Sequence, residues 1–149
     1  MVIVNIVVKK VPLCDENIVL MESIRQQSFD INCQVISKYT LINLVSGDFL
    51  PMGIYYNDEL IGAAYLSVLF NDLFFENVFI KKQYQNNEMH FGSILINGIF
   101  NDINKIRKYF NKDFLYARLE DSSGHPNFYK NLGFNYNDSI DDTYCKKRI

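Results

Sequence analysis

Three consecutive predicted strands followed by one long amphipathic helix constrain the fold of this chain more than any other feature. Residues 52–56, 60–69 and 73–82 read as strands, separated by turns at 57–59 and 71–72. Apolar residues then recur at alternating spacings of three and four, at Ile96, Ile99, Ile103, Ile106 and Phe110. This spacing is typical of a helix packed on a sheet, so we expect an antiparallel sheet with a long helix across one face.

The remaining segments extend this arrangement to one domain over residues 1–149. We expect a strand over 2–11, a helix with Asp15 as its N-cap, a second helix over about 32–44, a strand over 115–119, a short helix around Tyr129, and closing strands at Tyr136 and 143–147. The predicted order is β-α-α-β-β-β-α-β-α-β(-β). No repeat or linker divides the chain, and a chain of 149 residues is long enough to bury a sizeable core.

Composition argues against several classes of protein. A net charge of −2 gives no electrostatic reason to bind nucleic acid, and no apolar run is long enough to span a membrane. The lysines at the N-terminus follow the apolar run, which is the wrong order for a signal peptide, so we expect a cytoplasmic protein. Three cysteines without paired spacing argue against a disulfide framework and a zinc site, and we expect no metal.

The segment from Phe128 to Phe134, FYKNLGF, carries the clearest chemical signal. Pro126 suits the first turn of a helix, Gly133 suits its left-handed end, and Phe134 begins an extended segment. Tyr129 then lies one turn before the helix ends, where its phenol can donate a proton to a leaving group.

This motif and the order of elements resemble the GNAT (Gcn5-related N-acetyltransferase) superfamily along the whole chain. The resemblance implies a mixed, mostly antiparallel α/β (α+β) sheet flanked by helices, acetyl-CoA as co-substrate, and Tyr129 beside its sulfur as general acid. A similar string opens a module in glyoxalase-type metalloproteins, where several strands with metal ligands follow. Here only Asn135 to Ile149 follow, so the position favours the acetyltransferase.

The family binds the pyrophosphate of acetyl-CoA with a Q/R-x-x-G-x-G/A loop that leads into the long helix. Aligned on its last glycine, the corresponding cofactor-binding residues here are Asn87, Glu88, Met89, His90, Phe91 and Gly92, followed by Ser93. The sequence departs from the motif at Asn87 and at His90, which replaces the middle glycine. A side chain at His90 and a negative charge at Glu88 weaken a phosphate site, whereas backbone N–H donors remain.

The resemblance implies four further site residues. Glu76 corresponds to the catalytic base of histone-type members, and strand alternation is expected to place it on one face with Phe74, Val78 and Ile80. Apolar neighbours favour a raised carboxyl pKa, as a base requires, although many members deprotonate the amine through water and a solvated glutamate is equally compatible. The backbone at Ile80 and Lys82 corresponds to positions that bind the pantetheine arm. Ser122 stands where the family often has an asparagine that contacts the cofactor.

Two function classes follow. The first is an acyltransferase that moves the acetyl group of acetyl-CoA to a primary amine by direct attack, with Glu76 as base and Tyr129 as acid. The second is a non-catalytic GNAT-fold module that senses a ligand or binds a partner, with weakened coenzyme A binding. Acidic residues near the expected acceptor site suit a cationic small-molecule or peptide amine, namely Glu22, Asp30, Asp48, Asp138, Asp141 and Asp142. The identity of the amine stays open. The sequence also leaves open whether the chain forms a homodimer, which its 12 Phe and 10 Tyr residues would favour.

Overall fold

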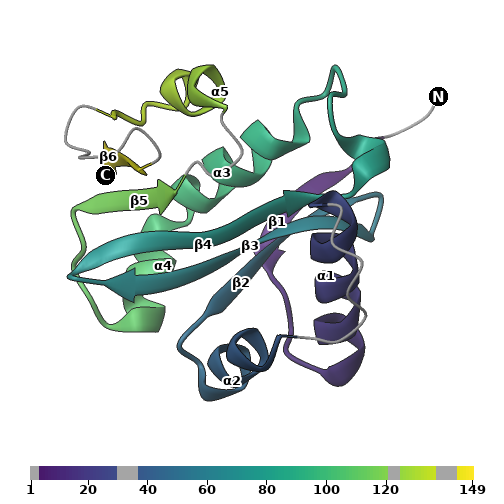
Figure 1. The fold of residues 1–149 in the computed structure, drawn as a ribbon, viewed down its shortest axis with the longest axis horizontal. Coiled ribbons are helices and arrows are strands. Elements are labelled where there is room, and N and C mark those ends of the chain that lie inside the picture. The colour runs from purple at the N-terminus through teal and green to yellow at the C-terminus, as the bar shows by residue number, and fades with distance from the viewer. Residues whose placement is uncertain (1–3, 30–36, 121–124, 137–143) are drawn as a thin grey trace.

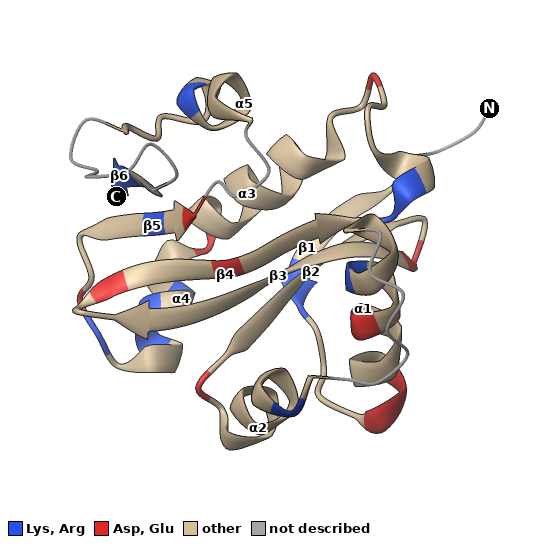
Figure 2. Cartoon of the chain, in the orientation of Figure 1, with Lys and Arg blue, Asp and Glu red and all other residues tan. Residues whose placement is uncertain are grey.

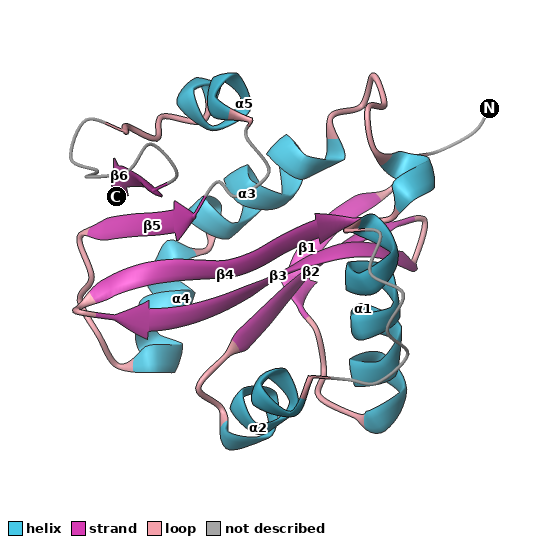
Figure 3. Cartoon of the chain, in the orientation of Figure 1, coloured by secondary structure: helices cyan, strands magenta, loops and turns pink. Residues whose placement is uncertain are grey.

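The computed structural model describes residues 4–29, 37–120, 125–136 and 144–149, and these build a six-stranded mixed sheet (Figures 1 and 3). The strands lie in chain order and are β1 (Ile6–Lys10), β2 (Leu50–Tyr56), β3 (Glu59–Leu69), β4 (Asp72–Ile80), β5 (Tyr116–Glu120) and β6 (Tyr144–Arg148). Every neighbouring pair is antiparallel except β4 and β5, which are parallel. The predicted fold class is confirmed.

Helices cover both faces of this sheet (Figure 1). They are α1 (Asp15–Ser28), α2 (Lys38–Ser46), α3 (Phe91–Asn101), α4 (Ile103–Phe110) and α5 (Pro126–Asn131), with a single 3-10 turn over Lys82–Tyr84. One buried cluster joins Met21 of α1 and Leu44 of α2 to Phe79 of the sheet. A second, larger cluster joins Leu95 and Ile99 of α3 to the opposite face. The two clusters define an α1 face and an α3 face.

The long helix predicted after the third strand is interrupted. Asp102 leaves helical geometry with φ −98° and ψ 16°, and its N–H is shared between the carbonyls of Gly98 and Ile99. Asn101 and Asp102 are weak helix formers, because their short polar side chains compete for backbone hydrogen bonds. The expectation of one continuous helix is therefore wrong. The predicted apolar face is nevertheless the one that packs on the sheet, because all five of its members belong to or pack against the α3-face cluster.

Strand β4 separates from β5 halfway along its length. Within the described residues the two strands pair only over 73–75 and 117–119, and β4 continues to Ile80. A β-bulge lies at the point of separation, because Tyr65 of β3 is opposite Asn77 and Leu66 is opposite Phe75. Glu76 is the extra residue between them. A bulge bends its strand and redirects the side chains that follow, so this one shapes the edge that β4 presents beyond β5.

None of the helices in the described ranges combines the length and apolar character that a membrane span requires. A search of those same ranges finds no group of three or more His, Cys, Asp or Glu side chains placed to hold a metal ion.

Candidate active site

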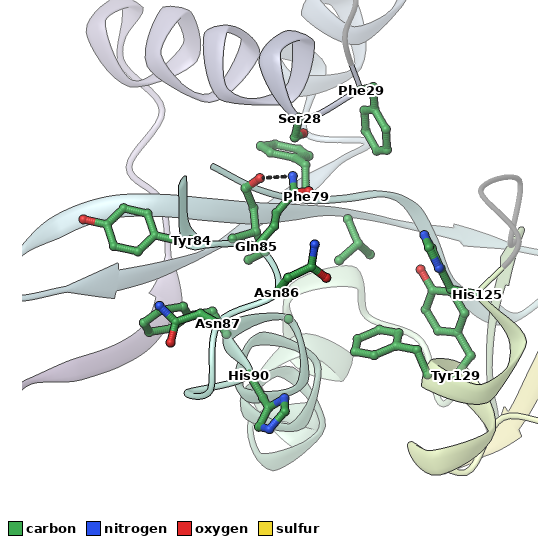
Figure 4. Close-up of a pocket in the computed structure, with 15 residues that line it drawn as sticks. Ser28, Phe29, Phe79, Tyr84, Gln85, Asn86, Asn87, His90, His125 and Tyr129 are labelled. Carbon is green, nitrogen blue, oxygen red and sulfur yellow. Dashed lines mark hydrogen bonds between the residues drawn. The ribbon is translucent and has the colours of Figure 1, made fainter. Parts of the chain in front are cut away.

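A pocket of about 390 Å³ opens where β4 leaves β5 (Figure 4). Five parts of the chain line it: the end of α1 (28–29), the end of β4 (78–80), the following loop (84–87), the start of α3 (90–92), and α5 (125 and 128–129). Ten of the 15 lining residues lie in the second half of the chain beyond β4, and Ser28 and Phe29 come from the first helix. Distant parts of the sequence therefore meet at one strand edge.

The pocket reaches both faces of the sheet. Ile80 belongs to the α3-face cluster and Val78 packs against it, whereas Phe79 belongs to the α1-face cluster. All three line the same pocket, and successive strand side chains point to opposite faces. The pocket thus passes around the free edge of β4. Two ligands can therefore meet in it, each approaching from a different face of the sheet.

The first turn of α3 supplies hydrogen-bond donors on the α3 face. The first N–H along the helix that bonds within it is that of Ile94, which donates to the carbonyl of His90 at 3.1 Å. The N–H groups of Phe91, Gly92 and Ser93 precede it and have no helical partner by geometry, and no side chain caps this end. This turn carries no charged side chain (Figure 2). Such a helix start suits an anionic group, because outward N–H groups and the helix dipole both favour negative charge.

Gly92 lets α5 approach this helix start. A Cβ atom at Gly92 would lie 3.2 Å from Cζ of Phe128, closer than most real Cβ contacts. The absence of a side chain on Gly92 therefore allows the ring of Phe128 to lie directly on the first turn of α3. This contact ties the two helical walls of the pocket together.

The loop before α3 is built by Asn87. Its side-chain oxygen accepts from the N–H of Met89 at 3.0 Å, and its carbonyl accepts from the N–H of His90 at 3.0 Å. His90 takes the left-handed conformation, with φ 54° and ψ 54°, which the middle glycine of the motif would adopt without strain. The loop thus turns into the helix despite the substitution, and it does so through side-chain and backbone contacts of Asn87.

The structure divides the predicted cofactor residues into two groups. Asn87, His90, Phe91, Gly92 and Ile80 line the pocket. The remaining predicted residues, Glu88, Met89, Ser93 and Lys82, are not among the residues that line it, and Ser122 lies outside the described residues. The Phe91 side chain is only 2% exposed and packs edge-on against Tyr56 and Tyr84, so only its backbone is available to a ligand.

The backbone carbonyl of Ile80 already has a partner. Nε2 of Gln85 donates to it at 2.8 Å, the bond drawn in Figure 4. The prediction that this backbone binds a pantetheine arm therefore requires the Gln85 side chain to share or leave the carbonyl. Gln85 was not predicted as a site residue, although it follows the strand by only five positions.

Glu76 lies on the α1 face. Its Oε1 accepts a 2.7 Å hydrogen bond from the hydroxyl of Ser67, two positions after Tyr65 of the α1-face cluster. The prediction that Glu76 shares a face with Val78 and Ile80 is wrong, because the bulge at Glu76 reverses the alternation between Phe75 and Val78. Glu76 is half-buried and does not line the pocket, and its role as a base stays a prediction.

Tyr129 lines the pocket from α5, and its local structure follows the sequence prediction. Pro126 begins the helix, and Gly133 ends it with φ +93°. The N–H of Gly133 donates to Lys130 and that of Phe134 to the carbonyl of Tyr129, both at 3.0 Å. The Tyr129 ring packs edge-on against Phe128 and Phe134, at centroid distances of 5.0 and 6.0 Å. These contacts fix the ring against the pocket wall.

His125 is a pocket residue that was not predicted as a site residue. It precedes Tyr129 by one helical turn, and Figure 4 shows the two side chains next to each other at the end of the pocket away from His90. The i, i+4 spacing is the signal that sequence reasoning could have used, since such residues share one side of a helix.

Glu22 does not serve the predicted acidic acceptor surface. It is 1% exposed, receives a 2.6 Å hydrogen bond from Nε of Arg25, and accepts from the hydroxyl of Tyr65 at 3.2 Å. Burial, and then the charge of Glu22, raise the pKa of Tyr65, so this hydroxyl remains a donor. The cluster anchors α1 to the sheet. Of the other acidic residues in that prediction, Asp48 is exposed, and Asp30, Asp138, Asp141 and Asp142 fall outside the described ranges.

No protein-family model and no curated protein matches this sequence. Many solved structures resemble its fold over nearly its whole length. One is the PaiA N-acetyltransferase of Thermoplasma acidophilum in complex with coenzyme A, with 21% identity, 97% of this chain and 99% of that chain covered, and a TM-score of 0.63. Another is the ribosomal-protein-S18-alanine N-acetyltransferase of Escherichia coli, with 16% identity, coverage of 97% and 94%, and a TM-score of 0.66.

A third is a GNAT family acetyltransferase of Elizabethkingia anophelis with acetyl-CoA bound, with 16% identity, coverage of 97% and 99%, and a TM-score of 0.59. At these identities the likeness establishes the fold. The chain has the GNAT fold, as the motif and the order of its elements predicted.

Proposed function

We propose that this protein is an N-acetyltransferase that uses acetyl-CoA to acetylate a primary amine. The observation that carries the proposal is the pocket around the free edge of β4, which brings together the bare first turn of α3 and Tyr129 of α5. Acetyl transfer between two substrates needs such a passage, because the thioester and the amine must meet at one point from different directions. The solved structures of this fold with coenzyme A or acetyl-CoA support the same assignment.

The residues present fit the co-substrate. The N–H groups at the start of α3 would hold the pyrophosphate, and the free edge of β4 near Ile80 would lie along the pantetheine arm. Acetyl-CoA would supply an acetyl group activated as a thioester. Tyr129 would give its phenolic proton to the departing sulfur. Glu76, the bulged residue, lies on the α1 face and does not line the pocket, so the role of base predicted for it would require a water between its carboxylate and the amine.

A non-catalytic ligand-binding module is the second candidate. The hydrogen bond from Gln85 to the carbonyl of Ile80 favours it, because part of the strand edge is already occupied by the chain itself. Glu88 adds negative charge two positions before His90 begins the helix. Both features weaken coenzyme A binding without closing the pocket.

Two measurements decide between these candidates. Thermal unfolding with and without millimolar acetyl-CoA tests binding, since a ligand at about 100 times its dissociation constant adds about 2.7 kcal/mol to the free energy of unfolding. Release of free thiol from acetyl-CoA in the presence of spermidine, tyramine or a short peptide with a free N-terminus tests turnover. Binding with amine-dependent thiol release supports the enzyme, and binding without turnover supports the module.

Tyr129→Phe tests the acid. Loss of a general acid lowers the turnover number by about 10²–10⁴-fold, whereas the thermal shift with acetyl-CoA should persist because the ring and its packing remain. Tyr109→Phe is the matched control, because Tyr109 is an exposed tyrosine of α4 that does not line the pocket. Equal rates for the two variants would contradict the role of Tyr129.

A further inference from the structure

His125 lines the end of the pocket that also holds Tyr129. Tyr129 follows four residues later on α5, and both side chains lie at the same end of the pocket in Figure 4. We propose that His125, in place of the predicted Glu76, is the general base of this site, which accepts a proton from the amine while Tyr129 protonates the leaving sulfur. This inference rests on the proposed acetyltransferase function.

The position of His125 is fixed by the packing of α5. The helix begins directly after it, and its carbonyl accepts from the N–H of Tyr129 at 3.4 Å. Phe128 lies on the first turn of α3, and the glycine-terminated end holds Tyr129 against Phe134. His125 itself is exposed, so its imidazole is accessible to a substrate in the pocket.

The other candidate bases lie outside the pocket or away from Tyr129. Glu76 does not line it and accepts from Ser67 on the α1 face. Tyr84 donates to Glu59 at 3.1 Å, outside the reacting end. His90 stands at the start of α3, and Figure 4 places it away from the neighbouring His125 and Tyr129.

The other titratable groups near His125 come from three parts of the pocket wall. The titratable residues that share its pocket in the described part of the chain are Tyr84, His90 and Tyr129, from the β4–α3 loop, α3 and α5. Lys130, the next residue on α5 after Tyr129, is exposed and stands over the ring of Tyr136. Imidazole changes its charge near neutral pH, so it can accept a proton from an attacking amine and release it again.

The proton balance closes between the two side chains. As the amine nitrogen bonds to the acetyl carbon, its proton passes to the imidazole of His125. As the carbon–sulfur bond breaks, its electron pair stays on sulfur, which takes the phenolic proton of Tyr129. The proton on His125 then returns to the tyrosinate, directly or through water, and both residues regain their starting state.

The test compares His125→Asn with His90→Asn, because the chain has only these two histidines. The turnover number of wild type should fall below neutral pH as the base is protonated, and this fall is the acidic limb of the pH profile. His125→Asn should lower the turnover number by about 10²–10⁴-fold and abolish or displace that acidic limb. His90→Asn should keep the limb, because Figure 4 places His90 away from Tyr129. Melting temperatures verify that both variants fold.

A second readout does not depend on turnover. Two histidines give two imidazole C2–H resonances in the NMR spectrum, and each variant assigns the one that remains. The His125 resonance should shift in Tyr129→Phe, whereas the His90 resonance should not shift.

The outcomes distinguish a failure of His125 as the base from a failure of the proposed acetyltransferase function. If wild type turns over and His125→Asn keeps both its rate and the acidic limb, the assignment of His125 as the base is overturned, and the proposed function is not. A His125 resonance that does not shift in Tyr129→Phe also overturns the assignment of His125 as the base. A wild type that neither binds acetyl-CoA nor releases thiol overturns the proposed function, and the base with it.

Discussion

Gly62→Ala tests whether close packing of β3 against β4 holds the pocket edge in place. Gly62 is opposite Ile80 in the register of the two strands. A Cβ atom at this position would lie 2.5 Å from the carbonyl oxygen of Phe79, 2.6 Å from Cδ1 of Ile80 and 3.1 Å from Cα of Ile80. Two of these atoms belong to the backbone of a central strand. They cannot rotate away, so the strands themselves must move apart.

The expected cost is large for a single methyl group. Overpacking an ordered interior costs about 1–3 kcal/mol, and we expect about 3 kcal/mol here because backbone is displaced. For a domain of about 150 residues, 1 kcal/mol corresponds to about 3 °C in melting temperature, so the midpoint should fall by about 9 °C. The displaced segment lines the pocket, so the thermal shift with acetyl-CoA should shrink as well.

Gly53→Ala is the control for this prediction. Its Cβ atom would also be crowded, but by side-chain atoms only: Cδ1 of Leu60 and Cγ2 of Val11 at 2.7 Å, and Cε2 of Tyr55 at 3.2 Å. Side chains can shift, so we expect about 1 kcal/mol and a fall of about 3 °C. Calorimetry or circular dichroism measures both variants. Equal midpoints for Gly62→Ala and Gly53→Ala would refute the argument from backbone contact.

Two further predictions concern stability. Tyr65→Phe should lower the free energy of unfolding by about 1.5–3 kcal/mol in a denaturant titration, because it removes a hydrogen bond to the buried carboxylate of Glu22; an unchanged value would exclude this bond as an anchor of α1. The hydrogen bond from Lys81 lowers the pKa of Glu59, so its contribution is present above the ordinary carboxyl pKa of about 4.3 and is lost as pH falls through the lowered value. Wild type should therefore lose more stability than Glu59→Gln between about pH 6 and pH 3, and parallel losses would contradict this.

Local sequence signals predicted the elements of this fold well. The period of two in the strands and the alternation of three and four in the helix depend on neighbouring residues, so they can be read without tertiary contacts. The helix end at Gly133 is of the same kind, since a left-handed residue favours glycine wherever it occurs. The break at Asp102 was missed, because its local signal was weaker than the apolar pattern that continued through it.

The sequence by itself determined the order of strands and helices, the likeness to the GNAT fold, and Tyr129 as a residue of interest. Only the tertiary structure decided that Glu76 faces Ser67, because one unpaired residue in a ladder reverses a strand face without any mark in the sequence. Only the tertiary structure joined the end of α1 to α5 and brought His125 into the pocket. Sites of this kind form between segments far apart in the chain, and their geometry depends on how the strands separate, which no local pattern records.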